Sequence, residues 1–164
     1  PIYIVGWGVQ YYFIGPFIEK FYIDETRENL ASKAYLIQSA INMKKSSVSL
    51  QDFVKESSEL SKIRITIIDT TGKVFADSEE DPNLMENHRT VSKRQEIETA
   101  IKRGLGSSQR YSTTINEDML YVAILVDHKS RPIIIRTSDS MASLSISIKA
   151  VSYTQLTQPT IRSV

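Results

Sequence analysis

The stretch Ile63–Ser78, IRITIIDTTGKVFADS, decides the fold of this chain. Its β-branched residues cluster before Asp69, and apolar character resumes at Val74 and Phe75. Two β-prone runs around a short turn are typical of a β-hairpin. Gly72 suits the positive φ that such a turn requires. We expect this hairpin to supply the first two strands of an antiparallel sheet.

Composition bounds the class of protein and excludes several functions. The 164 residues are 41% hydrophobic and 24% charged, which is typical of one globular domain. The net charge of +1 gives no electrostatic reason for a nucleic-acid partner. The chain has no cysteine and only two histidines, which excludes thiolate sites and disfavours histidine-rich metal sites. We therefore predict no nucleic-acid partner, no cofactor and no metal site.

Residues 1–18, PIYIVGWGVQYYFIGPFI, carry no charge and are rich in aromatic residues. A bilayer crossing needs about 20 apolar residues, so this run is slightly short of a full span. We interpret it as the outer part of a first transmembrane helix, with its aromatic residues near the membrane interface. A buried core helix or strand is the alternative interpretation.

A long helix is predicted to follow over Phe17–Ile41. Leu30, Ala34, Ile37 and Ile41 recur at spacings of four, three and four, which places them on one helical face. Charged residues occupy the other positions. We expect this helix to pair with its copy in a homodimer, with Ile37 in the interface. A plain amphipathic surface helix is the alternative.

The rest of the chain predicts an α+β layout. A short helix is expected over Leu50–Leu60, with Leu60 facing inward, and another from a Ser92 cap to Arg103, where Gly104 stops it. Three further strands are expected, joined by short loops: Ser107–Ile115, Met119–Val126 and Ile133–Thr137. Short loops make these strands sequential antiparallel neighbours. The prediction is one antiparallel sheet of about five strands with helices on one side.

Several segments together resemble a known family of sensor domains. They are ITIIDTTGKVFADS, DPNLMENHR, EIETAIKRGLGSSQRYS and DMLYVAILV, preceded by FYIDETRENLASKAYLI. Their order and spacing over about residues 17–150 are similar to the extracytoplasmic sensor domain of phosphate-regulon-type membrane sensor histidine kinases. The resemblance implies a PAS-like, CACHE-type ectodomain over residues 19–150.

The resemblance also implies a function. The domain would be the signal input of a two-component sensor kinase in a bacterial cell membrane, facing the periplasm or the exterior. It would sense a small ligand, a protein or stress, and would reach a response regulator only through a kinase part. The chain itself has no catalytic motif, phosphoacceptor His-Glu pair or P-loop. The alternatives are the ectodomain of a chemoreceptor or of a cyclic-dinucleotide cyclase, and a soluble PAS-like module that binds a small ligand.

The end of the chain departs from the family. Residues 139–150 are expected to begin a helix toward a second membrane span. Residues 151–164, VSYTQLTQPTIRSV, fit no element of a sensor domain. We interpret them as a non-native or disordered tail.

Four residues are candidates for ligand binding: His88, Arg89, Arg110 and Tyr121. In a PAS-like fold the loop after the hairpin borders the ligand pocket, and the third and fourth strands line it. A cationic cluster there would suit a carboxylate or another small anion. The alternative is that His88 caps a turn, Arg110 is solvated and Tyr121 is core. The acidic stretch 77–81 is read as a solvated loop, because it lacks the spacing of a calcium site.

Overall fold

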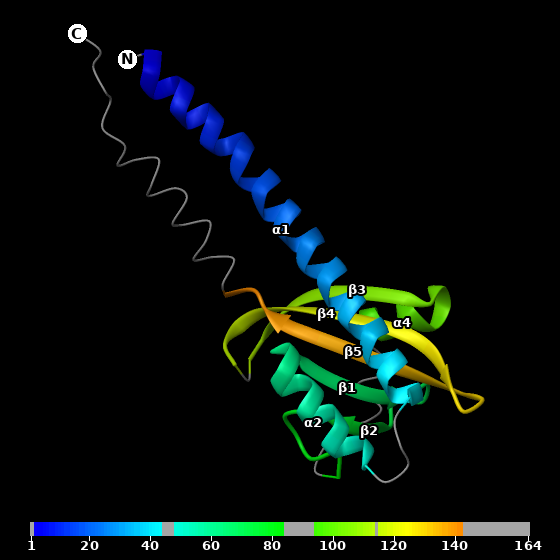
Figure 1. Ribbon diagram of the computed structural model, residues 1–164. Helices are drawn as coiled ribbons and strands as arrows, with labels where there is room; N and C mark the ends of the chain where they lie inside the picture. Colours follow the sequence, from blue (N-terminus) through cyan, green and yellow to red (C-terminus); the bar gives the residue numbers. More distant parts are fainter. Residues whose placement is uncertain (1, 44–47, 84–93, 114, 143–164) are drawn as a thin grey trace.

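The computed structural model describes residues 2–43, 48–83, 94–113 and 115–142, with side chains from Pro16 onward. Three helices and five strands lie in these ranges: α1 (Ile2–Met43), α2 (Leu50–Ser61), β1 (Arg64–Asp69), β2 (Val74–Asp77), α4 (Gln95–Arg103), β3 (Leu105–Ser112), β4 (Glu117–His128) and β5 (Arg131–Ser140). Helix α1 runs along the sheet and extends beyond it at its N-terminal end (Figure 1).

The five strands form one antiparallel sheet in the order β2-β1-β5-β4-β3. The last three strands in sequence are neighbours, as their short loops predict, and β1 pairs with β5. The predicted hairpin joins β1 and β2. Asp69 accepts hydrogen bonds from the backbone of Thr71 and Lys73, and Gly72 has a φ of 95°. The turn therefore forms as its Asp/Gly composition predicts.

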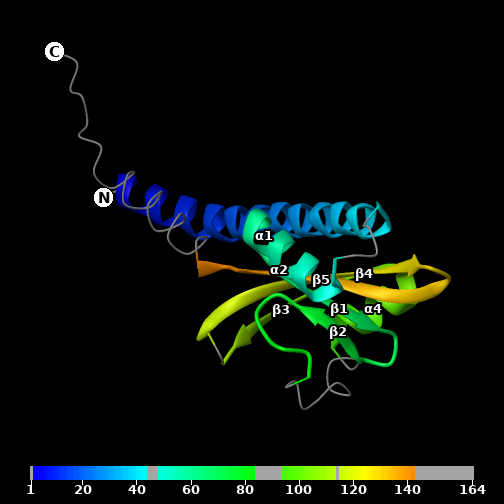
Figure 2. The same ribbon diagram turned by 60° about the horizontal axis from the view of Figure 1, so that its bottom comes forward.

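One face of the sheet is covered by α1 and α2 (Figure 2). The predicted helical stripe is buried there, against β4 and β5 residues such as Leu120 and Val122. Val54 of α2 is completely buried in the same cluster. The spacing of apolar residues in α1 therefore serves the core of this domain.

The opposite face is covered by α4, which packs on β3 and β4. Gly106 of β3 permits this contact. A Cβ atom at Gly106 would lie 2.1 Å from the backbone oxygen of Glu96 and 2.8 Å from the backbone nitrogen of Ala100. Only glycine lets the helix approach so closely. Gly106 therefore fixes how near the first turn of α4 lies to the sheet.

The predicted fold class is confirmed, with its five-stranded antiparallel sheet and long N-terminal helix. The expected placement of the helices on one side was wrong, because α4 covers the second face. Two further details were wrong: Leu60 is 80% exposed, and Ile37 is buried against the sheet and not available to a partner. The cap of α4 is Arg94; the predicted cap, Ser92, lies outside the described residues.

Residues 2–18 belong to α1, in one continuous helix with the segment that packs on the sheet. Among the described residues, no helix combines the length and the apolar character that a bilayer crossing requires. The transmembrane interpretation of residues 1–18 stays a prediction. The first two residues of the expected helix over 139–150 belong to β5, which extends through Ser140. The rest of that helix from residue 143, and the predicted tail at 151–164, lie outside the described residues.

Candidate functional site

Polar residues are concentrated on the α4 face of the sheet, where two rows of paired residues cross it. In the first row, Thr66 pairs with Asp77 and with Arg136. In the second row, Tyr121 pairs with Ser108 and with Ser138. Paired residues on neighbouring strands point to the same face. These rows bring side chains of all five strands together beneath the first turn of α4.

Glu96, in that first turn, is completely buried and paired with β3. Its carboxylate accepts hydrogen bonds from Arg110 at 2.9 and 3.2 Å and from the Ser108 hydroxyl at 2.6 Å. Burial opposes ionisation of Glu96, but the bonds from Arg110 and Ser108 outweigh it and hold the pKa below its ordinary value of 4.5. Glu96 is therefore an internal counterion for Arg110.

Asp77 plays the same role for Arg64 on the same face, in the edge strand β2. Its buried carboxylate accepts hydrogen bonds from Arg64 at 3.1 Å and from the Thr66 hydroxyl at 2.8 Å. It also accepts the backbone N–H groups of Glu79 and Glu80. Burial disfavours the charge of Arg64, but Asp77 and the two glutamates raise its pKa above the ordinary value. Part of the predicted acidic loop is thus an ion-pair partner of the sheet.

Arg136 lies between these two ion pairs and makes only a long ion pair with Glu96. It is only 5% exposed, and its Nη2 donates to the Thr66 hydroxyl at 3.1 Å. Its Nη1 is 3.8 Å from the Glu96 carboxylate, which is too far for a hydrogen bond. Among the described residues, neither its Nε nor its Nη1 finds an acceptor. Burial lowers the pKa of Arg136 to about 10, so its charge is poorly compensated.

Arg94, the N-cap residue of α4, adds a second buried cation. Its side chain makes no capping hydrogen bond, and its buried Nε has no acceptor in the described part of the chain. Burial, and then repulsion from Arg110, lower the pKa of Arg94. The positive end of the α4 dipole lies at the same place.

Tyr121 forms the floor of this cluster. The Arg110 guanidinium lies over its ring at 3.6 Å from the centroid, and the Arg136 guanidinium lies at 5.5 Å. Both distances are within the range of cation–π attraction. The ring therefore holds two like-charged side chains near one another.

The structure brings together two of the four predicted site residues, Arg110 and Tyr121. His88 and Arg89 lie outside the described residues, so their predicted role stays a prediction. Sequence reasoning did not find Glu96, Arg94 or Arg136. For Arg136 a signal existed, because one arginine interrupts the apolar strand Ile133-Ile-Ile135 and a charge inside a central strand needs a partner.

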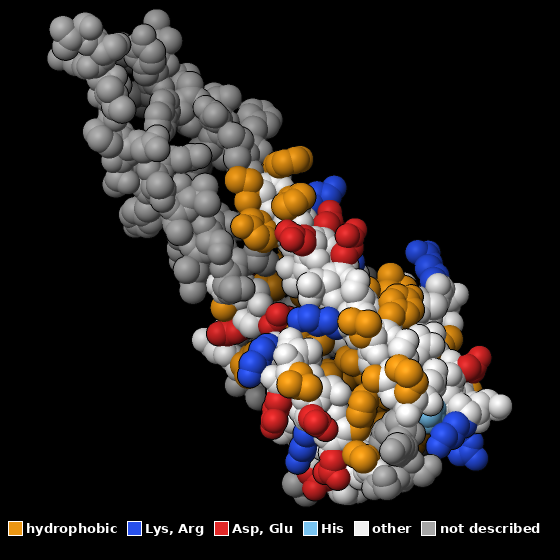
Figure 3. Space-filling view, viewed as in Figure 1, with side chains coloured by type: hydrophobic (Ala, Val, Ile, Leu, Met, Phe, Trp, Pro, Cys, Tyr) orange, Lys and Arg blue, Asp and Glu red, His pale blue; other side chains and the backbone are white. Residues whose placement is uncertain are grey.

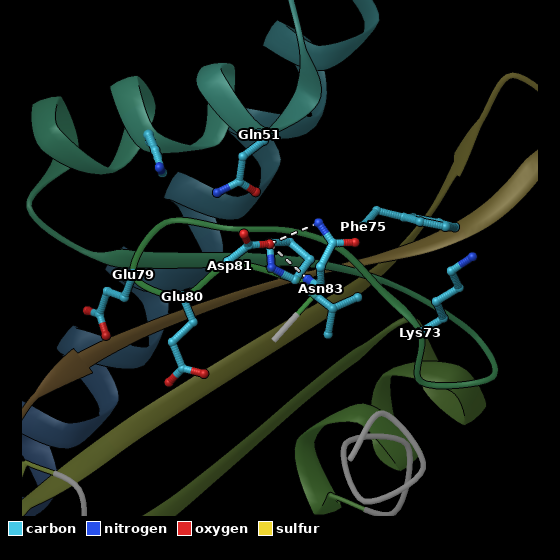
Figure 4. Close-up of a pocket in the computed structure, with 10 residues that line it drawn as sticks. Gln51, Lys73, Phe75, Glu79, Glu80, Asp81 and Asn83 are labelled. Atoms are coloured by element: carbon cyan, nitrogen blue, oxygen red, sulfur yellow. Dashed lines mark hydrogen bonds between the residues drawn. The ribbon is translucent and has the colours of Figure 1, made fainter. Parts of the chain in front are cut away.

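A hollow of about 630 Å³ lies elsewhere, between α2 and the β2 edge (Figure 4). Its charged lining combines Lys55 and Lys73 with Glu79, Glu80 and Asp81. Asp81 accepts hydrogen bonds from the backbone and side chain of Asn83, as the dashed lines in Figure 4 show. Glu79 and Glu80 are ion-pair partners of Arg64, at 2.9 and 3.3 Å. The unmatched cations of the sheet face are the stronger candidate for a site.

No family model matches the chain, and no curated protein sequence matches it. Several solved structures do. Two are ligand-binding domains of chemoreceptors: Tlp3 of Campylobacter jejuni with 4-methylisoleucine (TM-score 0.57, 9% identity) and the amino acid receptor PctC of Pseudomonas aeruginosa with GABA (TM-score 0.59, 13% identity). A third is the E. coli DcuS sensor domain (TM-score 0.50, 14% identity).

The matches cover 79%, 82% and 76% of this chain, respectively. They cover 57% and 61% of the two chemoreceptor domains and 98% of the DcuS domain. This chain therefore spans about three fifths of the two chemoreceptor domains. At these identities the likeness shows the fold, which is that of ligand-binding and sensor domains of bacterial receptors.

Proposed function

We propose that this chain is the signal-input ectodomain of a membrane-bound two-component sensor histidine kinase, facing the periplasm or the exterior. The fold is shared with sensor domains, which supports a sensing role. The observation that carries the proposal is the position of two adjacent residues in β5. Arg136 belongs to the cationic cluster, and Thr137 contacts α1 on the other face.

The contact of Thr137 is direct and buried. Its hydroxyl donates to the backbone oxygen of Leu30, in the middle of α1, at 3.1 Å. Successive residues of a strand point to opposite faces. A change at Arg136 therefore reaches α1 through one peptide unit of β5, without any intervening loop.

The proposed mechanism is a population shift between two packings of α1 on the sheet. A ligand that binds the cationic face moves β5 or α4 slightly, and the Thr137–Leu30 contact makes one position of α1 more favourable. Small helix shifts of this kind are a known output of receptor domains. Residues 1–18 at the start of α1 would carry the shift toward the membrane.

A homodimer through α1 is part of the proposal. Figure 3 shows apolar side chains gathered along the exposed side of α1, among charged ones. They are Phe17, Phe21, Tyr35, Leu36 and Met43, all at least 49% exposed. These five residues, and not Ile37, would form the dimer interface. Leu36→Lys should weaken self-association in sedimentation equilibrium, and unchanged association would remove α1 from the interface.

The kinase output can be tested in a chimera. The chain would be fused to a histidine-kinase core of known activity, and autophosphorylation would be measured in proteoliposomes. We expect Thr137→Val and Arg136→Met to change the autophosphorylation rate, because they alter the two ends of the β5 link. Arg131→Met, an exposed change in the same strand, is the control. Equal rates in all four proteins would overturn the signalling role.

A chemoreceptor is the second candidate, because two of the similar structures are chemoreceptor domains. The coding DNA that flanks this segment discriminates between them. The kinase proposal requires a downstream helix with a phosphoacceptor histidine and an ATP-binding domain. A long methylatable coiled coil in its place would assign the domain to a chemoreceptor.

A further inference from the structure

The two edge strands of the sheet, β2 and β3, are protected to different degrees. β2 has four residues, and its register with β1 shifts between Ile67 and Ile68. The Gln51 side chain of α2 accepts from the backbone N–H of Asp77 at 3.1 Å and donates to its carbonyl oxygen at 2.7 Å. These are the two bonds that a further strand would make at Asp77. A short, irregular strand with occupied backbone groups is a poor template for strand addition.

β3 lacks these protections in the described part of the chain. Its eight residues, Leu105–Ser112, pair with β4 without a shift in register. The Leu125 N–H donates to the Gly104 carbonyl oxygen, and residues bonded to the neighbouring strand alternate along an antiparallel pair. The backbone groups of every second residue therefore point outward from the margin of the sheet (Figure 1). These four outward residues are Leu105, Ser107, Gln109 and Tyr111.

The side chains of the four outward residues form an uncharged strip beside α1. They lie on the α1 face, because Ser108 and Arg110 alternate with them and bond to α4 on the other face. α1 packs on β4 and β5, and Tyr111 is 53% and Leu105 38% exposed. The Tyr111 hydroxyl donates to Asn116, which fixes the ring. An aromatic and an aliphatic side chain are therefore available near the two ends of this strand.

Charged residues lie only near the two ends of this strip. Lys102 and Arg103 are exposed in the last turn of α4, just before Leu105. At the other end, the exposed Asp118 pairs with Tyr111. Charge complementarity therefore favours an extended segment with an uncharged middle, an acidic residue beside Lys102 and Arg103, and a basic residue beside Asp118.

A second copy of this chain does not suit the β3 edge. Two β3 strands that continue the antiparallel sheet would be related by a twofold axis normal to the sheet, which reverses every direction in its plane. Because α1 runs along the sheet (Figure 2), the N-terminal ends of the two α1 helices would point in opposite directions. Two copies whose residues 1–18 are directed toward one membrane cannot pair in this way.

We infer that β3 is a docking edge for an extended segment of a partner protein, which adds a strand to the sheet beside β3. The outward backbone groups supply the hydrogen bonds, and Tyr111 and Leu105 contact alternate side chains of the segment. Lys102 and Arg103 select an acidic residue at one end of it. The choice of a partner protein over a second copy rests on the proposed function.

The test is a selection of peptides from a phage-displayed random library on the full chain. Binding of the selected synthetic peptides is then measured by fluorescence anisotropy. We expect them to be rich in β-branched and aromatic residues, with an acidic residue near one end and no proline. Gln109→Pro should weaken binding at least about tenfold, because it removes an outward N–H group but no bond to β4. Gln109→Thr keeps that N–H group and is the matched control, with unchanged binding expected.

N-methylation of the peptide provides a measurement that does not depend on a variant protein. Methyl groups on alternate residues block the donors of one side of an extended strand, so we expect binding to be lost in one alternation frame and kept in the other. The same change in both frames, or a library that yields no binding peptide, would overturn the inference. Frame-dependent binding that Gln109→Pro retains would also overturn it. If Gln109→Pro fails to fold, Tyr111→Ser takes its place, with a loss of about tenfold expected.

Sedimentation equilibrium of the peptide-free chain separates a partner protein from a second copy. We expect Gln109→Pro to leave self-association unchanged. Weaker self-association would assign the β3 edge to a second copy and overturn the partner proposal.

The histidine-kinase chimera separates this inference from the signalling proposal. Peptide binding at β3, combined with a chimera that does not respond to the Thr137 and Arg136 substitutions, would support the docking edge and remove the signalling role. A responsive chimera without any peptide binding would overturn the docking edge alone.

Discussion

The two faces of this sheet are built on opposite principles. The α1 face is apolar and closed: residues such as Ala34 of α1 and Val122 of β4 have no exposed surface. Its buried hydroxyl at Thr137 is hydrogen-bonded. Among the described residues, the α4 face holds four arginines, two buried carboxylates and three buried donors without an acceptor. Both faces belong to the same five strands.

The difference shows where the free energy of folding comes from and where part of it is given up. Burial of apolar surface contributes about 25 cal/mol per Å², so the α1 face stabilises the domain. Unmatched guanidinium groups on the α4 face reduce that stability. Functional sites are where proteins tolerate such a loss. The comparison therefore marks one face as scaffold and supports the proposal that a ligand binds the other.

The largest expected loss of stability comes from a substitution in the α1 face. Ile37→Lys places a charge at a position that is 6% exposed, against the sheet. We expect a loss of at least about 4 kcal/mol in the free energy of unfolding, measured by urea titration with circular dichroism. Asn29→Lys, on the exposed side of α1, should change it by less than about 0.5 kcal/mol. Similar losses for both variants would mean that α1 does not pack through this stripe.

The next effect concerns Glu96, the internal counterion of the α4 face. Glu96→Gln leaves Arg110 without a negative partner, and removal of one member of a buried ion pair costs about 3 kcal/mol. Glu98→Gln, on the exposed side of α4, is the matched control. The same unfolding measurement applies. A loss well below that of Ile37→Lys but above that of the control is the expected result.

The pH dependence of this effect has a definite sign. The pKa of Glu96 is lower in the folded state than the ordinary value of 4.5. Its contribution to stability is therefore complete above that value and is lost as the pH falls through the lower, folded-state pKa. Unfolding curves from about pH 7 to about pH 3 should show the wild type and Glu96→Gln converging in acid. A constant difference between them would show that the carboxylate charge is not responsible.

Much of the scaffold could be predicted from the sequence, because local chemistry determines it. The turn at Asp69–Lys73 needs only residues within five positions, and the stripe from Leu30 to Ile41 is a helical period. The strands joined by short loops paired as neighbours for the same reason. These features depend on spacing along the chain, which a sequence displays directly.

The α4 face could be predicted only in part. Arg110 and Tyr121 were identified from their strands. The sequence pattern predicts that Glu96 is an ordinary exposed residue of an amphipathic helix. Its burial depends on Gly106, ten residues later, which lets α4 descend onto the sheet. Arg136 and Thr66 are 70 residues apart and meet through strand pairing. Contacts of this kind depend on tertiary register, which no local pattern contains.

Gly106→Ala should produce an intermediate loss of stability that is confined to the α4 face. The new Cβ would meet the Glu96 carbonyl at 2.1 Å, so α4 must move away from β3. We expect a loss of about 2 kcal/mol in the free energy of unfolding. Gly104→Ala is the contrasting variant, since its φ of 85° is strained but no atom lies within 4 Å, and should cost about 1 kcal/mol. A larger loss of stability for Gly104→Ala than for Gly106→Ala would mean that α4 lies further from the sheet.

The smallest expected loss of stability comes from Thr137→Val, which tests the contact between β5 and α1. Thr137→Val keeps the size of the side chain and removes its hydrogen bond to Leu30, at a cost of about 1 kcal/mol in the unfolding experiment. Hydrogen exchange of the α1 amides near Leu30 should increase, while exchange in α4 should not. Ser138→Ala, the next residue of β5 and on the opposite face, is the control. If β5 transmits a change from Arg136 to α1, Thr137→Val should also uncouple the two residues. Binding of a ligand at the α4 face would persist, but it would no longer alter the hydrogen-exchange protection of α1.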